Sequence, residues 1–339
     1  MTEFRTDPIT GRTVLIVPSR AIRPNEHAPG ASPSPAVADC PFCEGNESWT
    51  PPEVAAVGPP GRQPNERGWY VRTIPNKFPT VMATAPERAP PRRGTEFEGH
   101  PGFGYHEVVI ESPTHAPLLP FLPSEQVLRV MRMCRDRVRE LSRRPQVGSV
   151  HLFENAGPDS GGSLWHPHSQ LVTTAGLSPS LRDEVEGAER YRQRGGGNCA
   201  FEAVRLAEAR EGARLLFDSG EFAAFAPFAS AFPYEVRLLP ARHAPSFADA
   251  TDREVEALSE TLPNLLRALL TLVPGASYNF VIRSPVASGT AYERYHWHLD
   301  LYPRLVRPDG FDLGSGFHVN SVSPEDAAAA LRSALGAKR

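Results

Sequence analysis

The chain has 339 residues, a length that corresponds to about two domains of ordinary size. Acidic residues outnumber basic residues by 39 to 36, which gives a net charge of −3. This balance excludes an overall basic field for nucleic acid or for an anionic membrane surface. Apolar residues make up 40% and charged residues 22%, which is typical of a globular protein with a buried core. We therefore expect no nucleic-acid partner and no membrane partner.

Cysteine usage and the first residues indicate the compartment. Four cysteines in a chain of this length do not form a disulfide framework. The opening MTEFRTDPITGR lacks the apolar core of a signal peptide, and no apolar run approaches the roughly 20 residues of a membrane helix. We expect a cytoplasmic protein.

The first half predicts a loop-rich start, then strands around one helix. Residues 24–68 are rich in Pro, Gly, Ser and Asn, and they surround a Cys-x-x-Cys segment. Residues 105–111 alternate as a strand does. Ser124 is a suitable N-cap for a helix with one apolar face. Two further strands are expected at 147–154 and 168–174.

The second half predicts the same elements in the same order. A strand is expected at 234–239. Thr251 and Glu254 have the spacing of a capping box, and an apolar helix face follows them. The closing strands are expected at 278–282 and 298–302.

Matching offsets indicate that the chain arose by duplication. His243 follows His115 by 128 positions, and His298 follows His168 by 130 positions. Each closing strand is preceded by a His-x-His sequence, and several elements in matching order are harder to explain by chance than one pair. We predict an α+β fold of two halves, each with an antiparallel sheet and one long helix. The expected halves are residues 1–175 and 176–339.

The densest chemical stretch is NAGPDSGGSLWHPHSQ, residues 155–170. Its glycines let the backbone approach a ligand, and successive amides can form a nest for an anion. His168 and Gln170 lie two residues apart, so in a strand they face the same side. A histidine beside phosphate-binding groups can act as a nucleophile, which suits transfer of a nucleotidyl group. The alternative is a simple turn with histidines that only satisfy local hydrogen bonds.

Cys40 and Cys43 predict a metal site. Both thiolates of a Cys-x-x-Cys turn can bind one Zn²⁺, and structural zinc needs two more ligands. The loop-rich setting disfavours the alternative of a thioredoxin-like redox motif. The residues alone leave five candidate partners, namely His106, His115, His151, His166 and His168.

These segments together resemble the galactose-1-phosphate uridylyltransferases of the histidine-triad superfamily. The resemblance runs nearly from end to end, through DPITGRTVLIVPSRAIRP, CPFCEGNE, SPTH and FENAG…GGSLWHPHSQ. It continues through PYEVRLLPARH, YHWHLDLYPR and GFDLGSGFHVN. It implies a ping-pong reaction in which UDP-glucose uridylylates a histidine and galactose 1-phosphate then takes up the uridylyl group. A histidine-triad-like fold is implied as well.

The resemblance also assigns roles to residues. The second histidine of HPH, His168, is the implied nucleophile, and Gln170 is implied to hold a phosphate oxygen. The implied zinc ligands are Cys40, Cys43, His115 and His166. The implied nucleotide and phosphate contacts are Arg20, Arg23, Asn76, Asn155, Gly161, Gly162 and Ser163. A homodimer is implied, in which GFDLGSGFHVN completes a neighbour's site.

The chain departs from the family pattern in two ways. Some members hold iron through a glutamate, the second His-x-His and one more histidine. Here His296, His298 and the candidate Glu184 are present, but no histidine lies between His243 and His296. We therefore expect the iron site to be missing or remodelled, and the second His-x-His to be a structural remnant.

The late GFDLGSGFHVN segment also resembles a branch that includes ADP-glucose phosphorylase, which transfers AMP to phosphate. Uridylyl transfer between hexose 1-phosphates is the main functional expectation. Adenylyl transfer, hydrolysis of the nucleotidyl group and a non-catalytic nucleotide-binding module are its alternatives. A module that only binds would not need the nucleophilic imidazole of His168.

Overall fold

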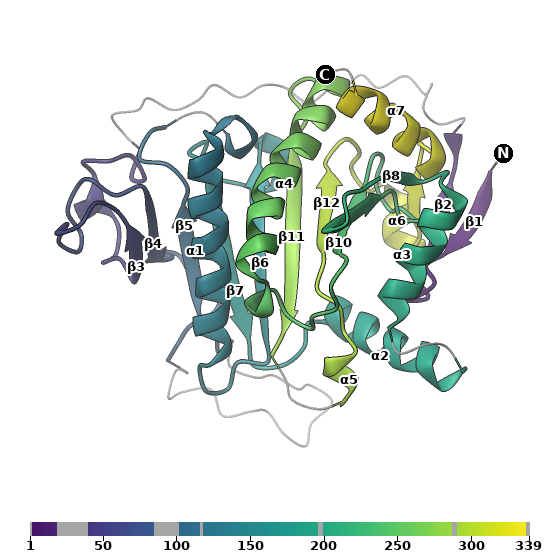
Figure 1. The fold of residues 1–339 in the computed structure, drawn as a ribbon, viewed down its shortest axis with the longest axis horizontal. Helices are drawn as coiled ribbons and strands as arrows, with labels where there is room; N and C mark the ends of the chain where they lie inside the picture. The colour runs from purple at the N-terminus through teal and green to yellow at the C-terminus, as the bar shows by residue number, and fades with distance from the viewer. Residues whose placement is uncertain are drawn as a thin grey trace.

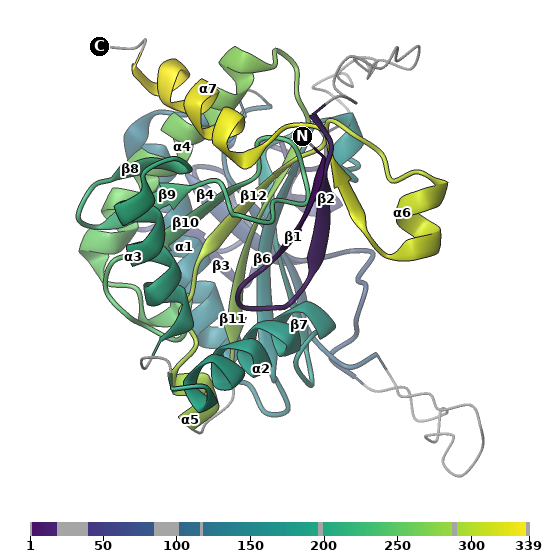
Figure 2. The same cartoon turned by 90° about the vertical axis from the view of Figure 1, so that its right-hand side faces the viewer.

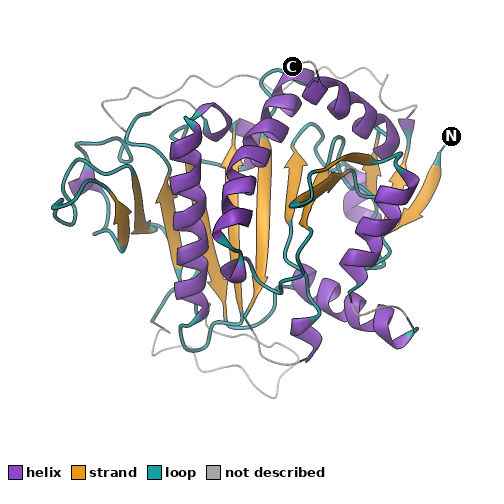
Figure 3. Cartoon of the chain, in the orientation of Figure 1, coloured by secondary structure: helices purple, strands orange, loops and turns teal. Residues whose placement is uncertain are grey.

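The computed structural model describes residues 2–18, 40–84, 102–115, 118–195, 199–286 and 290–336. A ten-stranded antiparallel sheet forms its middle layer (Figures 1 and 3). The strands of the first half are β3 (Ala55–Val57), β4 (Val71–Pro75), β5 (His106–Ile110), β6 (Ser149–Ala156) and β7 (His168–Thr174). Those of the second half are β8 (Leu215–Asp218), β9 (Phe222–Phe225), β10 (Val236–Pro240), β11 (Tyr278–Pro285) and β12 (Leu299–Pro303).

The strand order is symmetric about the centre of this sheet. It runs β3-β4-β5-β7-β6-β11-β12-β10-β9-β8, so each strand of one half has a counterpart at the same distance from the middle. The long central strands β6 and β11 pair over eight residues and join the halves into one sheet. The predicted α+β class with two similar halves is confirmed. We propose that the halves divide after residue 175, between β7 and the next helix.

Helices cover one side of the long sheet. The two long helices, α1 (Ser124–Ser142) and α4 (Asp252–Leu272), pack against each other and against the sheet, and α7 (Pro324–Gly336) packs on α4 (Figure 1). The shorter helices are α2 (Pro179–Gln193), α3 (Ala200–Glu211), α5 (Thr290–Glu293) and α6 (Gly310–Ser315). None of the helices in the described parts of the chain is long and apolar enough to span a membrane.

A small second sheet lies near α6, toward the side of the molecule away from α1 and α4 (Figure 2). It consists of β1 (Glu3–Thr6), β2 (Thr13–Ile16) and β13 (His318–Asn320). β1 and β2 are antiparallel, whereas β13 runs parallel to β2, so residues 318–320 pair with the first strands of the chain here.

Local sequence explains how the long helices begin. The Thr251 hydroxyl accepts a hydrogen bond from the Glu254 backbone N–H, and the Glu254 carboxylate accepts one from the Thr251 backbone N–H, which confirms the predicted capping box of α4. The prediction that Ser124 caps α1 is wrong by one residue. Pro123 occupies the cap with extended backbone angles and makes no side-chain capping bond, while Ser124 is the first helical residue.

Two faces of the sheet have different roles because successive strand residues point to opposite sides. Leu171 packs in the core cluster with α1 and α4. Val108 and Ile110 instead pack with Cys40 and Cys43 on the other side. His168 lies opposite Ile110 in the β5–β7 pair, so its side chain points to the same side as Ile110, away from the helices. The helix-covered side of the sheet is therefore core, and the opposite side carries His168.

Two carboxyl groups are buried on the core side, behind the strand that carries His168. Glu111 and Glu154 are 0% and 1% exposed, and the hydroxyl of Ser169 donates to Glu111 Oε1 at 2.6 Å. Burial raises the pKa of Glu111 to about 8, and burial together with the nearby Glu111 carboxyl raises the pKa of Glu154. Burial therefore favours the neutral, protonated form of both carboxyl groups.

This burial predicts a pH-dependent stability. The folded chain retains protons that the unfolded chain loses above the ordinary carboxyl pKa of 4.5, so the free energy of unfolding should fall as pH rises from there to about 8. Glu111→Gln should make this fall less steep, as measured by urea unfolding between pH 5 and pH 9. Glu125→Gln, at an exposed carboxylate, is the control and should keep the wild-type slope. Equal slopes in all three proteins would contradict the burial argument.

Candidate active site and metal centre

Cys40, Cys43, His115 and His166 converge, and their ligand atoms all lie within 4.8 Å of one another. The two cysteines occupy a tight turn in which the Cys43 N–H donates to the Cys40 carbonyl at 3.3 Å. Asn46 donates its side-chain amide to the same carbonyl at 2.9 Å. These residues can hold a metal ion. His106, His151 and His168, the other histidines considered from the sequence, are not in this group.

Hydrogen bonding prepares His166 as a metal ligand. Its Nε2 lies 2.7 Å from the Ser112 carbonyl oxygen, which can only accept, so Nε2 carries the proton. Nδ1 therefore presents its lone pair, and it lies 3.5 Å from the sulfur of Cys40 and 3.7 Å from that of Cys43. A carbonyl that fixes the free nitrogen is the usual outer support of a histidine ligand.

The spacing of the ligand atoms fits a tetrahedral metal. Ordinary zinc–sulfur and zinc–nitrogen bond lengths give a sulfur-to-nitrogen edge of about 3.6 Å in a tetrahedron. The Cys43 sulfur lies 3.5 Å from Nδ1 of His115, in agreement with the distances at His166. Burial and the neighbouring Cys40 raise the pKa of Cys43 to about 12 without an ion. The donor set therefore calls for a cation that stabilises the thiolates.

His168 is oriented by the backbone of His166. Its Nδ1 lies 2.7 Å from the His166 carbonyl oxygen, so Nδ1 carries the proton and Nε2 presents a lone pair. The side chain is only 6% exposed, and burial lowers its pKa, which keeps the imidazole neutral. Phe42 lies between Cys40 and Cys43 in the sequence, and its ring packs edge-on against the His168 ring with the ring centroids 5.3 Å apart. The arrangement leaves the lone pair of Nε2 available for chemistry.

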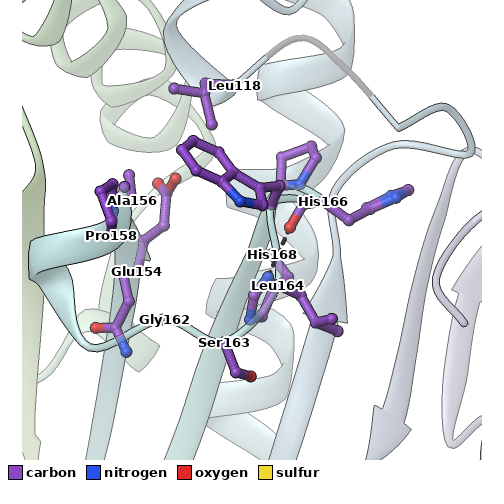
Figure 4. Close-up of a pocket in the computed structure, with 13 residues that line it drawn as sticks. Leu118, Glu154, Ala156, Pro158, Gly162, Ser163, Leu164, His166 and His168 are labelled. Atoms are coloured by element: carbon purple, nitrogen blue, oxygen red, sulfur yellow. Dashed lines mark hydrogen bonds between the residues drawn. The ribbon is translucent and has the colours of Figure 1, made fainter. Parts of the chain in front are cut away.

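A pocket of about 270 Å³ opens beside His168. Figure 4 draws the residues that line it and the hydrogen bond between His166 and His168. Of the predicted site residues, the lining includes Asn155, Gly162, Ser163, His166 and His168.

The loop that borders this pocket needs its glycines. Gly161 has φ of +87°, a conformation that side chains other than glycine rarely adopt, and it turns the chain rather than lining the pocket. A Cβ at Gly162 would lie 2.9 Å from the Asn155 carbonyl oxygen. The positive φ therefore explains Gly161, and the close approach of the two segments explains Gly162.

The remaining predicted contact residues lie farther along the sheet face that carries His168, or outside the residues that the structure describes. Gln170 faces the same side of β7 as His168 and is hydrogen-bonded to His106, which also contacts Asn76. Neither Gln170 nor Asn76 lines the pocket. Arg20 and Arg23 lie outside the described residues.

The second half repeats the hydrogen bond between a histidine Nδ1 and the backbone carbonyl two residues earlier, but charged side chains surround this histidine. His298 Nδ1 donates to the His296 carbonyl at 3.0 Å, as His168 does to His166. Its Nε2, however, lies 3.7 Å from Glu184 and 3.6 Å from Asp300. Burial lowers the pKa of His298, but the two carboxylates more than compensate and raise it overall. A raised pKa favours the protonated ring, in which Nε2 has no lone pair for nucleophilic attack.

The same surroundings do not fit the expected iron ligand set. The guanidinium of Arg283 lies 2.7 Å from Glu184 and 3.2 Å from Asp300, and Arg237 lies 2.7 Å from Asp300. These buried cations already neutralise the carboxylates that a metal would need. Glu184, His298 and Asp300 bring ligand atoms within 4.8 Å of one another, but Arg283 forms ion pairs with both carboxylates.

His296 belongs to another group that sequence reasoning missed. Its ring meets Cys199 and His243, and the three ligand atoms lie within 4.8 Å of one another, so the group could hold a metal ion. His296 Nε2 donates to the Arg242 carbonyl at 3.1 Å and Nδ1 faces Cys199, which repeats the arrangement of His166. The correspondence of His115 and His243 was the available signal, because Cys199 stands alone in the sequence.

Comparison with known proteins identifies the family. Residues 1–177, more than half of the chain, match the model for the N-terminal domain of galactose-1-phosphate uridyl transferase. The chain belongs to the galactose-1-phosphate uridyl transferase family. The predicted resemblance is confirmed, and with it the expectation of a uridylyltransferase enzyme.

Individual relatives span the whole chain. An ADP-glucose phosphorylase of Arabidopsis thaliana is 30% identical over 335 residues, covering 97% of this chain and 92% of the relative. A galactose-1-phosphate uridylyltransferase of Thermotoga maritima is 26% identical over 341 residues and covers 98% of both. The crystal structure of an ADP-glucose phosphorylase from Arabidopsis thaliana with bound ADP-glucose has a TM-score of 0.82 at 29% identity, with 98% of both chains covered. This likeness confirms the expected histidine-triad-like fold.

The geometry predicts that metal binding and nucleophilicity are separable. Cys43→Ala should lose the metal and lower the melting temperature, because it removes a ligand and leaves the second thiol without its cation. His168→Ala should keep the metal, because its ring lies outside the ligand group. Metal content per chain by mass spectrometry and thermal unfolding measure both effects. Equal loss of metal in the two variants would contradict the assignment.

Proposed function

We propose that this family member transfers UMP from UDP-glucose to galactose 1-phosphate through a uridylyl-histidine at His168. The observation that carries the proposal is the neutral imidazole with its proton fixed on Nδ1, which leaves Nε2 free to attack beside the pocket. Family membership and the full-length uridylyltransferase relative support the choice of substrates.

The proposed reaction has two balanced steps. Nε2 of His168 attacks the α-phosphorus of UDP-glucose, a phosphorus–nitrogen bond forms, and the bond to the bridging oxygen breaks to release glucose 1-phosphate. A phosphate oxygen of galactose 1-phosphate then attacks the same phosphorus, which forms UDP-galactose and returns the electron pair to Nε2. The ring is cationic between the steps, and the His166 carbonyl that accepts from Nδ1 stabilises that charge.

The surrounding groups are proposed to bind the phosphates. Asn155, Ser163 and Gln170 supply donors beside or along the face that carries His168, and Gly161 and Gly162 let the loop backbone approach. Asn76 and the arginines Arg20 and Arg23 are proposed as further nucleotide contacts. Donors aimed at the phosphate stabilise the charge that develops during transfer.

We assign Zn²⁺ to the group of Cys40, Cys43, His115 and His166. Two thiolates and two imidazoles at these spacings are the donor set of a closed structural zinc site, which supports the assignment. A bound zinc would supply the cation for the thiolates and hold the His166 ring. The chain's own residues carry out the proposed transfer.

Adenylyl transfer from ADP-glucose is the second candidate. It is favoured by the Arabidopsis relatives, one named ADP-glucose phosphorylase and the other a structure with bound ADP-glucose. Attack by His168 and departure of glucose 1-phosphate would be the same. The base and the acceptor would differ.

We also propose a homodimer in which α6 reaches the site of the neighbouring copy. Phe311 and Leu313 on this helix are 49% and 78% exposed, although both are large apolar side chains. Sedimentation of the active chain should give the mass of a dimer, and a fully active monomer would contradict this arrangement.

A cytoplasmic location is consistent with four free cysteines, and export of the mature chain would contradict it.

Intact-mass measurement tests the proposal. The metal-loaded chain is mixed separately with UDP-glucose and with ADP-glucose, and His168→Ala is treated in the same way. We expect one UMP adduct from UDP-glucose, none in the variant, and loss of the adduct when galactose 1-phosphate is added. An AMP adduct instead would establish the second candidate. Absence of any adduct in a folded, metal-loaded protein would overturn covalent transfer and favour hydrolysis or simple binding.

A further inference from the structure

Two of the proposed phosphate contacts are side-chain amides, and an amide has two unlike ends. Phosphate oxygens only accept hydrogen bonds, so Asn155 and Gln170 help only if they present their NH₂ groups. The opposite orientation would place a carbonyl oxygen against an anion. What fixes each amide is therefore part of how the site works.

His106 fixes Gln170. The backbone N–H of Thr80 donates to Nδ1 of His106 at 3.0 Å, so that nitrogen has no proton and Nε2 carries one. Nε2 lies 2.9 Å from Oε1 of Gln170 and donates to it. His106 is buried, and burial lowers its pKa, in keeping with a neutral ring. The NH₂ group of Gln170 is thereby directed away from His106.

Asn279 fixes Asn155 by the same logic. Its Nδ2 lies 2.9 Å from the carbonyl oxygen of Ser160, which can only accept, so the NH₂ end of Asn279 is identified without ambiguity. The same Nδ2 donates to Oδ1 of Asn155 at 2.7 Å. Asn155 must then turn its own NH₂ group away from Asn279, and Asn155 lines the pocket.

Asn76 shows the same orientation through a local bond. Its Oδ1 accepts the backbone N–H of Phe78 at 2.8 Å, so its NH₂ group is the free end. That group lies 3.0 Å from Nε2 of His106. Since both nitrogens carry protons, this contact is no hydrogen bond. Among the described residues the Asn76 NH₂ group therefore has no hydrogen-bond acceptor.

We infer that His106 and Asn279 are positioning residues that hold Gln170 and Asn155 with their NH₂ ends toward the substrate phosphates. The inference rests on the proposed function and deepens it. Each orientation is traced to a backbone group whose role cannot change, the Thr80 N–H on one side and the Ser160 carbonyl on the other.

The inference also gives the second half a part in the reaction. Asn279 lies on β11 and Asn155 lies directly opposite it on β6, across the junction of the two halves. The central strand of the second half therefore orients a residue that lines the pocket beside His168.

Double-mutant cycles test the His106 arm. His106→Phe keeps a ring but removes the donor, whereas His106→Gln can place an amide N–H near the position of Nε2. Each is made in the wild type and in Gln170→Ala, and kcat and KM are measured for exchange of labelled glucose 1-phosphate into UDP-glucose. His106→Phe should lower kcat about 10- to 100-fold, the range for a lost hydrogen bond to a charged group, and His106→Gln should recover most of it. In Gln170→Ala, His106→Phe should have no further effect.

The Asn279 arm is an independent check. Asn279→Asp is nearly isosteric but replaces the donor by an acceptor that faces Ser160 O and Asn155 Oδ1. Its kcat should fall by a similar factor, and the fall should disappear in Asn155→Ala. Metal content and melting temperature of every variant are compared with the wild type, so a folding defect is recognised.

The outcomes separate this inference from the proposed function. Full activity of His106→Phe and Asn279→Asp, or losses that add to those of Gln170→Ala and Asn155→Ala, would overturn the positioning roles. The proposed function would stand in that case if Gln170→Ala still impaired exchange. A folded, metal-loaded wild type without exchange from UDP-glucose or ADP-glucose would instead contradict the proposed function itself.

Discussion

The segment His166–Pro167–His168 carries the constraint on which the site depends. The ring of His166 faces the metal-group thiols, and its carbonyl oxygen accepts the Nδ1 proton of His168. One residue therefore links the metal centre to the tautomer and direction of the nucleophile. The Cys-x-x-Cys loop adds a second link, because Phe42 packs against the His168 ring. A metal held by Cys40, Cys43, His115 and His166 would fix the His166 ring, and with it the backbone carbonyl that accepts the Nδ1 proton of His168.

The two halves show what this constraint does and does not determine. In both halves, Nδ1 of a histidine donates a hydrogen bond to the backbone carbonyl two residues earlier. Burial lowers the pKa of His168, which favours the neutral ring with a lone pair on Nε2, whereas Glu184 and Asp300 beside His298 raise its pKa and favour the protonated ring. The backbone fixes the tautomer, and the neighbouring charges decide whether the ring is a nucleophile. The two halves thus differ in the charges around the paired histidine, while Asn279 on β11 of the second half hydrogen-bonds Asn155 of the first-half pocket.

Short-range sequence patterns predicted much of this arrangement. Strand β7 occupies the predicted residues 168–174, and the Thr251 capping box forms as expected. The Cys-x-x-Cys and His-x-His spacings identified side chains that do converge. Long-range register could not be predicted in the same way. The orientation of Asn155 depends on which residue of β11 lies opposite it, and Cys199 meets His296 only because distant segments fold together. Local patterns also fail in places. Ser124 was predicted to cap α1 because serine is a common N-cap residue, but Pro123 occupies the cap position and Ser124 is the first helical residue.

The most direct test of the account is the protonation of the two paired histidines. The chain is labelled with ¹⁵N-histidine, and the ring nitrogens are observed by NMR at pH 7, with His168→Gln and His298→Gln used to assign the signals. The account predicts that His168 is neutral, with the proton on Nδ1 and a bare Nε2, and that His298 carries protons on both nitrogens. A His168 ring with its proton on Nε2, or a doubly protonated His168 at this pH, would contradict the claim that the His166 carbonyl prepares the nucleophile.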